Sequence, residues 1–204
     1  MRPLLLLCVT ALLLLTGCQQ NEPKATAEID TSYAKTYDGN PQIPDDRTLT
    51  KIGDTLQAEK GFLTLEAANF QTETIHIADV TLTVHDTKRM TLEPDYSMMD
   101  YFHMLTEETE FSIVKAFVTI KNEGKEPVVF SPVAQIESTH GIQTYERDIY
   151  LDDVTGKINP GETKQGNIGY IIDPEENKWT VQTTPVYDVH EKSIAHPKTY
   201  TLQP

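Results

Sequence analysis

Short apolar runs with a period of two residues constrain this chain more than any other feature. Val80 to Val84 (VTLTV) alternates large apolar residues with threonines, and Ile113 to Ile120 (IVKAFVTI) is rich in β-branched residues. Successive side chains of a strand point to opposite faces, so such runs suit half-buried strands. Turn-forming residues follow, as in Lys121 to Glu126 (KNEGKE) and Asn159 to Glu162 (NPGE). The pattern predicts strands joined by short turns.

Weaker runs of the same kind recur along the chain. We expect further strands at 62–67, 128–130, 134–136, 166–172, 179–181 and 199–201. About eight short strands separated by turn signals are typical of an antiparallel β-sandwich. The predicted fold class is therefore all-β.

One segment departs from the period of two. Glu93 to Glu108 (EPDYSMMDYFHMLTEE) places Met98, Phe102 and Leu105 on one helical face, after start signals at Pro94 and Asp95. We predict a short helical insertion between two strands, with Phe102 buried.

The insertion is also rich in methionine, an adaptable apolar residue that is frequent on binding surfaces. Met99 and Met104 lie off the predicted buried face, and Tyr101 adds an aromatic ring. We expect Met99, Tyr101 and Met104 to form a surface for a partner. Packing of the insertion over an open end of the sheets is the alternative.

The N-terminus has the layout of a secretory signal. Arg2 precedes an apolar run from Leu4 to Leu15, which is too short to span a bilayer as a helix. Leu15, Thr16, Gly17 and Cys18 follow in the order of a bacterial lipobox, which they resemble. The resemblance implies that Cys18 receives a diacylglyceryl group, with palmitate-type acyl chains, and becomes the mature N-terminus. An ordinary secretory signal that contains cysteine is the alternative.

Cysteine usage agrees with a lipid anchor. The chain has two cysteines, Cys8 within the expected signal peptide and Cys18 at the expected acylation site. The mature protein would keep no thiol for a disulfide, a metal site or catalysis. We therefore expect attachment to the outer face of the bacterial cell membrane through acylated Cys18.

A polar stretch follows the expected anchor. Residues 19–48 contain three prolines and few large aliphatic residues, and show no sustained period, which is typical of a flexible tether. We predict a signal peptide at 1–17, an anchored tether at 18–48 and a β-sandwich domain at 49–204.

The net charge of −14 limits the partners of the domain. Nucleic acids and anionic membrane surfaces attract basic proteins, so the charge argues against both. Solubility explains the charge most simply, and an acidic site for cations is the alternative.

Four stretches together resemble a known domain family. They are Val118 to Gly124 (VTIKNEG), Pro127 to Phe130 (PVVF), Asn159 to Glu162 (NPGE) and Gly166 to Tyr170 (GNIGY). They resemble the immunoglobulin-like domain of unknown function in secreted bacterial lipoproteins, which is similar to a mycobacterial secreted immunogenic antigen of that fold. The resemblance implies an immunoglobulin-like sandwich and brings no catalytic residues with it.

Candidate metal ligands are sparse. His103 and Glu107 lie four residues apart on the predicted helix, but a metal site needs further ligands. Asp173 to Asn177 (DPEEN) resembles the start of a calcium loop without its central glycine and closing glutamate. That stretch, and Asp152 with Asp153, are better explained as turns. We predict no metal and no cofactor.

Catalytic motifs are also missing from the sequence. It contains no Gly-x-Ser-x-Gly elbow, no phosphate-binding loop and no dinucleotide fingerprint. We predict no catalytic residues and identify no small-molecule substrate. Sites assembled from distant residues are recognised only by geometry.

The function predicted from the sequence is a lipid-anchored, extracytoplasmic binding module for a protein or cell-envelope partner, with no enzymatic activity. Two alternatives are an envelope hydrolase that uses carboxylates near 93–108 and a divalent-cation-binding surface protein. A cleft with two carboxylates of raised pKa would favour the enzyme. An exposed apolar patch beside the insertion would favour the binding module.

Overall fold

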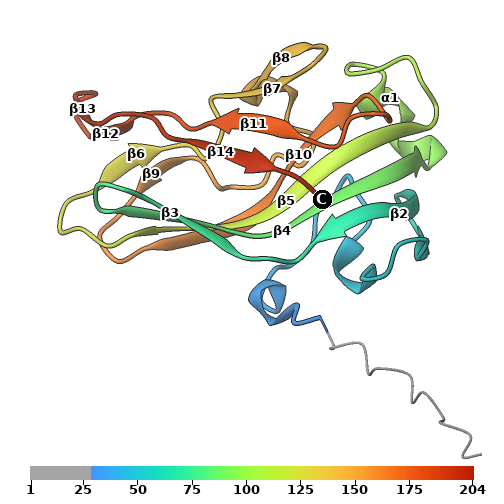
Figure 1. Cartoon of the computed structure of the whole chain (residues 1–204), viewed down its shortest axis with the longest axis horizontal. Coiled ribbons are helices and arrows are strands. Elements are labelled where there is room, and N and C mark those ends of the chain that lie inside the picture. Colours follow the sequence, from blue (N-terminus) through green and yellow to red (C-terminus); the bar gives the residue numbers. More distant parts are fainter. Residues whose placement is uncertain (1–28) are drawn as a thin grey trace, which may run out of the picture.

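Alternating apolar residues form two packed layers of strands in the computed structural model, which describes residues 29–204 (Figure 1). The first layer is a six-stranded antiparallel sheet in the order β1-β2-β4-β5-β10, with β3 paired to β4. Its strands are β1 (Thr55–Ala58), β2 (Gly61–Asn69), β3 (Glu73–Ile77), β4 (Val80–Pro94), β5 (Phe111–Asn122) and β10 (Thr163–Ile172).

The second layer consists of two four-stranded sheets, in the orders β14-β11-β7-β8 and β13-β12-β6-β9. Their strands are β6 (Val128–Phe130), β7 (Gln135–Ser138), β8 (Gly141–Thr144), β9 (Gly156–Ile158), β11 (Trp179–Gln182), β12 (Val186–Asp188), β13 (Ser193–Ala195) and β14 (Thr199–Leu202). All strand pairs are antiparallel. The predicted all-β sandwich is confirmed.

The central core includes residues from both layers. Val114, Val118 and Tyr170 of the six-stranded sheet are buried in one apolar cluster with Trp179 and Val181 of β11. Every second residue of β5 from Val114 to Ile120 belongs to this cluster, as the period of two predicts.

A β-bulge at His85 changes the face of the sheet to which the alternate side chains of β4 point. The register shifts between Val84 and Asp86, so His85 is an extra residue relative to β5. Val84 belongs to the central core, whereas Met90 belongs to a second cluster. The bulge therefore directs Asp86 and Lys88 to the same side as Phe117, the register partner of Asp86.

The second cluster includes residues of the N-terminal segment, which we define as residues 29–48. Ile43 of this segment and Leu49, which follows it, are buried there with Leu63 of β2, Ile113 of β5 and their neighbours. In Figure 1 the N-terminal segment lies on the face of the six-stranded sheet opposite to β11 and β14. It contains two short 3₁₀ helices, η1 (Ser32–Ala34) and η2 (Asp46–Thr48).

The predicted tether at 18–48 is wrong for its described part, residues 29–48. Ala34, Ile43 and Asp46 are at most 3% exposed, and Tyr33 stacks on His85 with ring centroids 4.7 Å apart. The segment has few apolar residues, but those few reach the sheet, and a buried charge supplements them. The folded domain therefore begins well before residue 49, and residues 18–28 lie outside the described range.

The predicted strands are confirmed in position, with longer bounds. The run at 80–84 belongs to the fifteen residues of β4, and the run at 113–120 to the twelve residues of β5. Short strands with weak periodicity were not predicted: β1, β3, β8, β9, β12 and β13.

The predicted helical insertion is also confirmed. It contains the 3₁₀ helix η3 (Tyr96–Met98) and the α-helix α1 (Met99–Phe102). Phe102 is 1% exposed, and Met98 and Leu105 pack against the second cluster, as expected. Met104 is 71% exposed, whereas Met99 is only partly exposed.

Candidate functional site

Two aspartates cap the free edge of β10. They belong to the capping segment, which we define as residues 145–155 and which begins with the 3₁₀ helix η4 (Tyr145–Arg147). Asp148 Oδ1 accepts a hydrogen bond from Gly169 N at 3.0 Å, and Asp152 Oδ2 accepts one from Asn167 N at 2.7 Å. Side chains thus satisfy N–H groups that an edge strand would otherwise expose.

Two glycines of β10 allow this close approach. A Cβ atom at Gly169 would lie 2.6 Å from the ring of Tyr150, and one at Gly166 would lie 2.8 Å from Cβ of Asp152. Only glycine fits at such distances without a backbone shift. The Gly166 to Tyr170 stretch noted in the sequence is therefore required by the capping segment.

The capping segment, β10 and the loop after β6 enclose a cleft of about 160 Å³. We name it the Asp148 cleft. Two carboxylates, two tyrosines, two hydroxyl residues and four apolar residues line it: Asp148, Asp152, Tyr145, Tyr170, Ser131, Thr155, Pro132, Val133, Leu151 and Ile168. No Lys, Arg or His of residues 29–204 is among them.

Asp148 has a strongly perturbed pKa. Burial raises the pKa of its carboxyl to about 7, although hydrogen bonds from the N–H groups of Tyr150 and Gly169 act to lower it. The negative charge of Asp152 acts in the same direction as burial. Within the described part of the chain, Asp148 forms no ion pair. Burial without a cation explains the shift.

Tyr170 lines the same cleft, but its hydroxyl is buried behind the lining. The side chain is fully buried, and its Oη has no hydrogen-bond partner among residues 29–204. Burial, followed by the charge of Asp148, raises the pKa of the phenol. Buried hydroxyls in folded proteins nearly always have a partner, so an unpaired one is exceptional.

The outer wall of the cleft carries a strained and exposed residue. Leu151 has φ of 55°, in the left-handed region, and is 62% exposed. Tyr145, which also lines the cleft, is 56% exposed. Strained backbone and exposed large apolar side chains are both more frequent at functional sites than elsewhere.

The helical insertion braces the capping segment. Tyr101 Oη donates to the carbonyl of Ile149 at 2.8 Å, and Arg147 Nη2 donates to the carbonyl of Leu105 at 2.7 Å. Tyr101 is therefore half-buried and engaged within the protein. The predicted partner surface of Met99, Tyr101 and Met104 stays a prediction, with Met104 as its most exposed member.

Acidic residues beside the insertion line a separate, open hollow of about 560 Å³. Glu108 and Glu110 are exposed there, next to Phe111 and Ile171. Asp148 lines the other cleft, which neither glutamate lines. Of the carboxylates near 93–108 that the hydrolase alternative would use, Glu108 thus shares a hollow with Glu110.

A second group of charged residues is completely buried under the N-terminal segment. We name it the ion cluster: Asp46, Asp86, Lys88 and Lys115. Lys88 Nζ lies 2.7 Å from Asp46 Oδ2, and Lys115 Nζ lies 3.0 Å from the same oxygen and 3.1 Å from Asp86 Oδ1. All four residues are at most 3% exposed. The two negative and two positive charges balance.

Mutual attraction keeps the ion cluster charged. Burial acts to raise the pKa of Asp46, but the charges of Lys115 and Lys88 outweigh it and lower the pKa. Burial acts to lower the pKa of Lys115, and the charges of Asp46 and Asp86 outweigh it and raise the pKa. The N-terminal segment thus contributes the negative charge of Asp46, which neutralises part of the positive charge of the buried lysines on the sheet.

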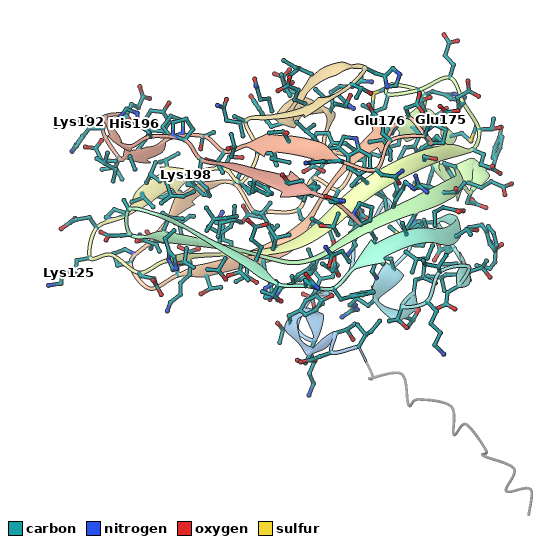
Figure 2. The ribbon with its side chains drawn as sticks, in the orientation of Figure 1. Lys125, Glu175, Glu176, Lys192, His196 and Lys198 are labelled. Carbon is teal, nitrogen blue, oxygen red and sulfur yellow. The ribbon has the colours of Figure 1, made fainter. Side chains whose placement is uncertain are left out.

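The calcium-like stretch at 173–177 is a turn, as predicted, and Glu176 anchors it. Glu176 accepts hydrogen bonds from Trp179 Nε1 at 3.0 Å, from Thr139 N at 2.8 Å and from the Thr139 hydroxyl. Burial acts to raise its pKa, but these bonds and one from His140 lower it to about 2. Figure 2 shows Glu175 and Glu176 at the end of the sandwich that carries α1, with Lys125 and Lys192 at the other end.

Metal ligands do not converge in residues 29–204, where no group of three or more His, Cys, Asp or Glu side chains is placed to hold an ion. His103 and Glu107 are both exposed. No helix within the same residues has the length and apolar character needed to cross a membrane. Leu15, Thr16, Gly17 and Cys18 lie outside them.

Sequence reasoning missed both the cleft and the ion cluster. Lys115 interrupts the apolar run at 113–120, and a lysine in such a place is a signal for a buried counter-charge. Asp148 has a weaker signal, because it only precedes the apolar Ile149 and Tyr150 in a segment without period.

Comparison with known proteins identifies relatives of the whole chain. A family model described as a domain of unknown function, DUF4352, matches residues 72–194, a range that contains Asp148 and Tyr170 but not Asp46. The uncharacterized protein YdhF of Bacillus subtilis (strain 168) is 35% identical over 230 residues, and the match covers 96% of each chain.

A solved structure shows a likeness of fold. A functionally unknown protein from Listeria monocytogenes EGD-e superposes with a TM-score of 0.51 and 12% identity, covering 70% of this chain and 86% of that one. The yjhA protein of Bacillus subtilis gives a TM-score of 0.34 and 14% identity, covering 75% of this chain and 97% of that one. At 12% identity, the likeness to the Listeria protein concerns the fold alone.

Proposed function

Because the chain belongs to the DUF4352 family of domains of unknown function, we propose a role from its own site. The protein is a lipid-anchored, extracytoplasmic module that binds a ligand in the Asp148 cleft and catalyses no reaction. It acts at the outer face of the bacterial cell membrane, where it serves a protein or cell-envelope partner.

The Asp148 cleft is the observation that carries the binding role. Within residues 29–204 it combines a half-buried carboxylate without a cation, a fully buried tyrosine without a hydrogen-bond partner and a residue with strained backbone. Each feature costs free energy in the unbound protein. A ligand that pairs with the carboxylate removes part of that cost.

The cleft supports binding better than catalysis. An enzyme of the carboxylate type needs a second acid or base next to the first. Asp152, the other carboxylate, already accepts hydrogen bonds from Asn40 Nδ2 at 2.9 Å and from Asn167 N at 2.7 Å. Burial raises the pKa of Asp148 to about 7.

The lipid anchor rests on the sequence Leu15 to Cys18. We expect Cys18→Ala to leave the protein unacylated, because the thioether requires the thiol. Metabolic labelling with a fatty-acid analogue, followed by detergent partitioning, checks this. Replacement of Cys8 by Ala is the matched control and should keep the label. Label retained by Cys18→Ala would refute the anchor.

Binding is tested through the amide resonance of Gly169, whose N–H donates to Asp148. Small molecules and peptides extracted from a bacterial envelope should shift this resonance in the full chain, held in detergent. The shift should disappear in Asp148→Asn and persist in Asp153→Asn, because Asp153 is exposed outside the cleft. An extract that leaves Gly169 and Asn167 unchanged at any concentration would contradict the binding role.

A further inference from the structure

The open hollow of about 560 Å³ beside the helical insertion has the form of a docking site. Its floor crosses three adjacent strands, because Thr91 of β4 pairs with Ser112 of β5, and Ser112 pairs with Ile172 of β10. Its volume lies within the roughly 300–1,000 Å³ of ligand pockets. Four of its nine lining residues are apolar: Phe111, Ile171, Ile172 and Pro174. The hollow can therefore take a large apolar side chain.

The insertion adds exposed apolar surface beside the hollow. Thr106 lines the hollow, and Met104, two residues earlier in the chain, is 71% exposed. Tyr96 of the same insertion is 91% exposed. Methionine adapts its shape to a partner, and exposed apolar groups that gather in one region are typical of protein–protein contact sites. The apolar contribution at this end thus extends beyond the hollow itself.

The charge around the hollow has one sign. The range 93–110 contains no Lys or Arg, and its six acidic residues are all exposed: Glu93, Asp95, Asp100, Glu107, Glu108 and Glu110. None of the six forms an ion pair with a residue of the range 29–204. Such a group of uncompensated charges attracts a positive partner and repels a negative one.

Two arginines reach this end of the sandwich, and both are bonded to carbonyl groups. Arg89 Nη1 donates to the carbonyls of Pro174 at 2.9 Å and Glu176 at 3.2 Å. Arg147 Nη2 donates to the carbonyl of Leu105 at 2.7 Å. Neither arginine lines the hollow. Their two positive charges leave most of the six negative charges without compensation.

We propose that the hollow beside the insertion binds a basic segment of a partner protein. One apolar side chain of that segment fills the hollow against Phe111 and Ile171, and flanking lysines or arginines meet Glu108 and Glu110. A metal ion would cover none of the apolar surface, and residues 29–204 offer no group of three ligands to hold it. The site is separate from the Asp148 cleft, and it specifies the partner that the proposed function leaves open.

Peptide titrations of the full chain, held in nanodiscs of phosphatidylcholine, test the proposal. The probe is a short lysine-rich peptide with one central leucine. Two further peptides replace the leucine by serine or the lysines by glutamate. The amide resonances of Ser112 and Ile171, which both line the hollow, report binding.

The leucine peptide should shift these resonances saturably, and added salt should weaken its binding. The serine peptide should bind about tenfold more weakly, because burial of a leucine side chain is worth about that factor or more. The glutamate peptide should cause no shift. Equal affinity of the leucine and serine peptides, or no shift with either, would overturn the proposal.

Paired substitutions separate a local site from a general effect of net charge. Glu108→Gln with Glu110→Gln removes two negative charges at the hollow and should weaken binding of the leucine peptide severalfold. Glu126→Gln with Glu191→Gln is the matched control and should leave the affinity unchanged. Each control glutamate is exposed and next in sequence to a lysine that Figure 2 shows at the opposite end of the sandwich. Equal losses in the two variants would contradict a docking site.

Ser112→Tyr tests the role of the hollow. Tyrosine suits a strand and fills the space above the floor, so the variant should bind the leucine and serine peptides equally. A preference for leucine that persists would place the apolar contact elsewhere and refute the proposal. Spermine tests the occupant, because it is a polycation without an apolar side chain. Spermine that binds as tightly as the leucine peptide would refute the partner class.

Failure here is separable from failure of the proposed function, because the two sites have different reporters. If the envelope extract shifts Gly169 and no peptide shifts Ser112, the basic partner is wrong and the binding role of the Asp148 cleft stands. If the leucine peptide shifts Ser112 and the extract leaves Gly169 unchanged, the docking site stands and the cleft is not a binding site.

Discussion

The ion cluster and the Asp148 cleft each contain two aspartates, but only those of the ion cluster meet lysines. Asp46 and Asp86 lie within 3.1 Å of a lysine Nζ. Asp148 and Asp152 instead accept hydrogen bonds from uncharged N–H groups, one each from the backbone of β10. Both arrangements bury carboxylates near the six-stranded sheet. The ion cluster balances its charge within the chain. In the cleft, the charge of Asp148 is neutralised either by a proton, which the raised pKa favours, or by an external cation.

This difference separates a structural site from the proposed binding site. A balanced buried cluster contributes little net free energy by itself, but removing one member leaves an uncompensated charge. An acid in a cleft without a counter-charge behaves in the opposite way. Removing its charge removes the free-energy cost of burying that charge, so the folded state becomes more stable. Substitutions in the two regions should therefore change stability in opposite directions.

Loss of the N-terminal segment should have the largest effect. A chain that starts at Leu49 lacks Asp46 and Ile43, so it breaks the buried ion pairs, at about 3–5 kcal/mol, and removes a buried side chain worth about 1.5–3 kcal/mol. We expect a loss of roughly 5 kcal/mol or more in the free energy of unfolding, measured in urea. A chain that starts at Ile29 retains every described contact and is the control. Equal stability of the two chains would mean that residues 29–48 act as the predicted tether and do not stabilise the fold.

Lys115→Met should have the next largest effect. Methionine fills similar volume but leaves Asp46 paired with Lys88 alone and leaves Asp86 with no lysine of residues 29–204, so we expect a loss of about 3–5 kcal/mol. Lys121→Met, on the same strand but half exposed, should change the free energy of unfolding by less than about 0.5 kcal/mol. A small effect at Lys115 would mean that the cluster is not balanced as described.

Asp148→Asn should be stabilising at alkaline pH. The folded pKa of about 7 exceeds the unfolded value of 3.8, so the folded protein binds more protons between these values and loses stability as pH rises through 7. Relative to Asp148→Asn, the wild-type protein should lose about 1–3 kcal/mol between pH 5 and pH 8.

Denaturation curves at the two pH values check this. Asp153→Asn, in an exposed ion pair with Lys164, should show a pH-independent difference from wild type. A parallel pH dependence of wild type and Asp148→Asn would contradict the raised pKa and remove one support for the cleft.

The exposed methionines should have the smallest effect. Met104→Ser should leave the free energy of unfolding within about 0.5 kcal/mol, since Met104 is 71% exposed. Met99 is only partly exposed, so Met99→Ser should cost somewhat more. Thermal melts of each variant measure the effect. A loss of several kcal/mol at Met104 would show that it is part of the core and would withdraw the predicted partner surface.

The strands were predictable from the sequence because their signal is local. Alternation in β4 and β5 reflects which face each residue buries, and seven or more residues repeat it. The switch of faces at His85 was not predictable, because a bulge adds one residue without breaking the apolar pattern. Short strands such as β12 and β13 have three residues each, too few for a period.

The ion cluster and the cleft were beyond sequence reasoning because their partners are distant in the chain. Asp46 is buried only because Lys88 and Lys115, on two other strands, meet it. Asp148 reaches the site only because Gly169 lets the capping segment approach β10. Residues 29–48 have the composition of a tether because they contain few apolar residues. Composition does not show that a charged residue in such a segment pairs with buried charges elsewhere.

Packing of the N-terminal segment determines how far the cleft stands from the bilayer. With Cys18 acylated, only residues 19–28 separate the lipid from the folded domain, and they span at most about 40 Å even at full extension. A tether that ran to residue 48 would have allowed nearly three times that span. With the proposed anchor, the domain would therefore stay within a thin layer next to the membrane. The proposed ligand would then have to reach that layer, either as a diffusing solute or on a partner that is itself near the lipid surface.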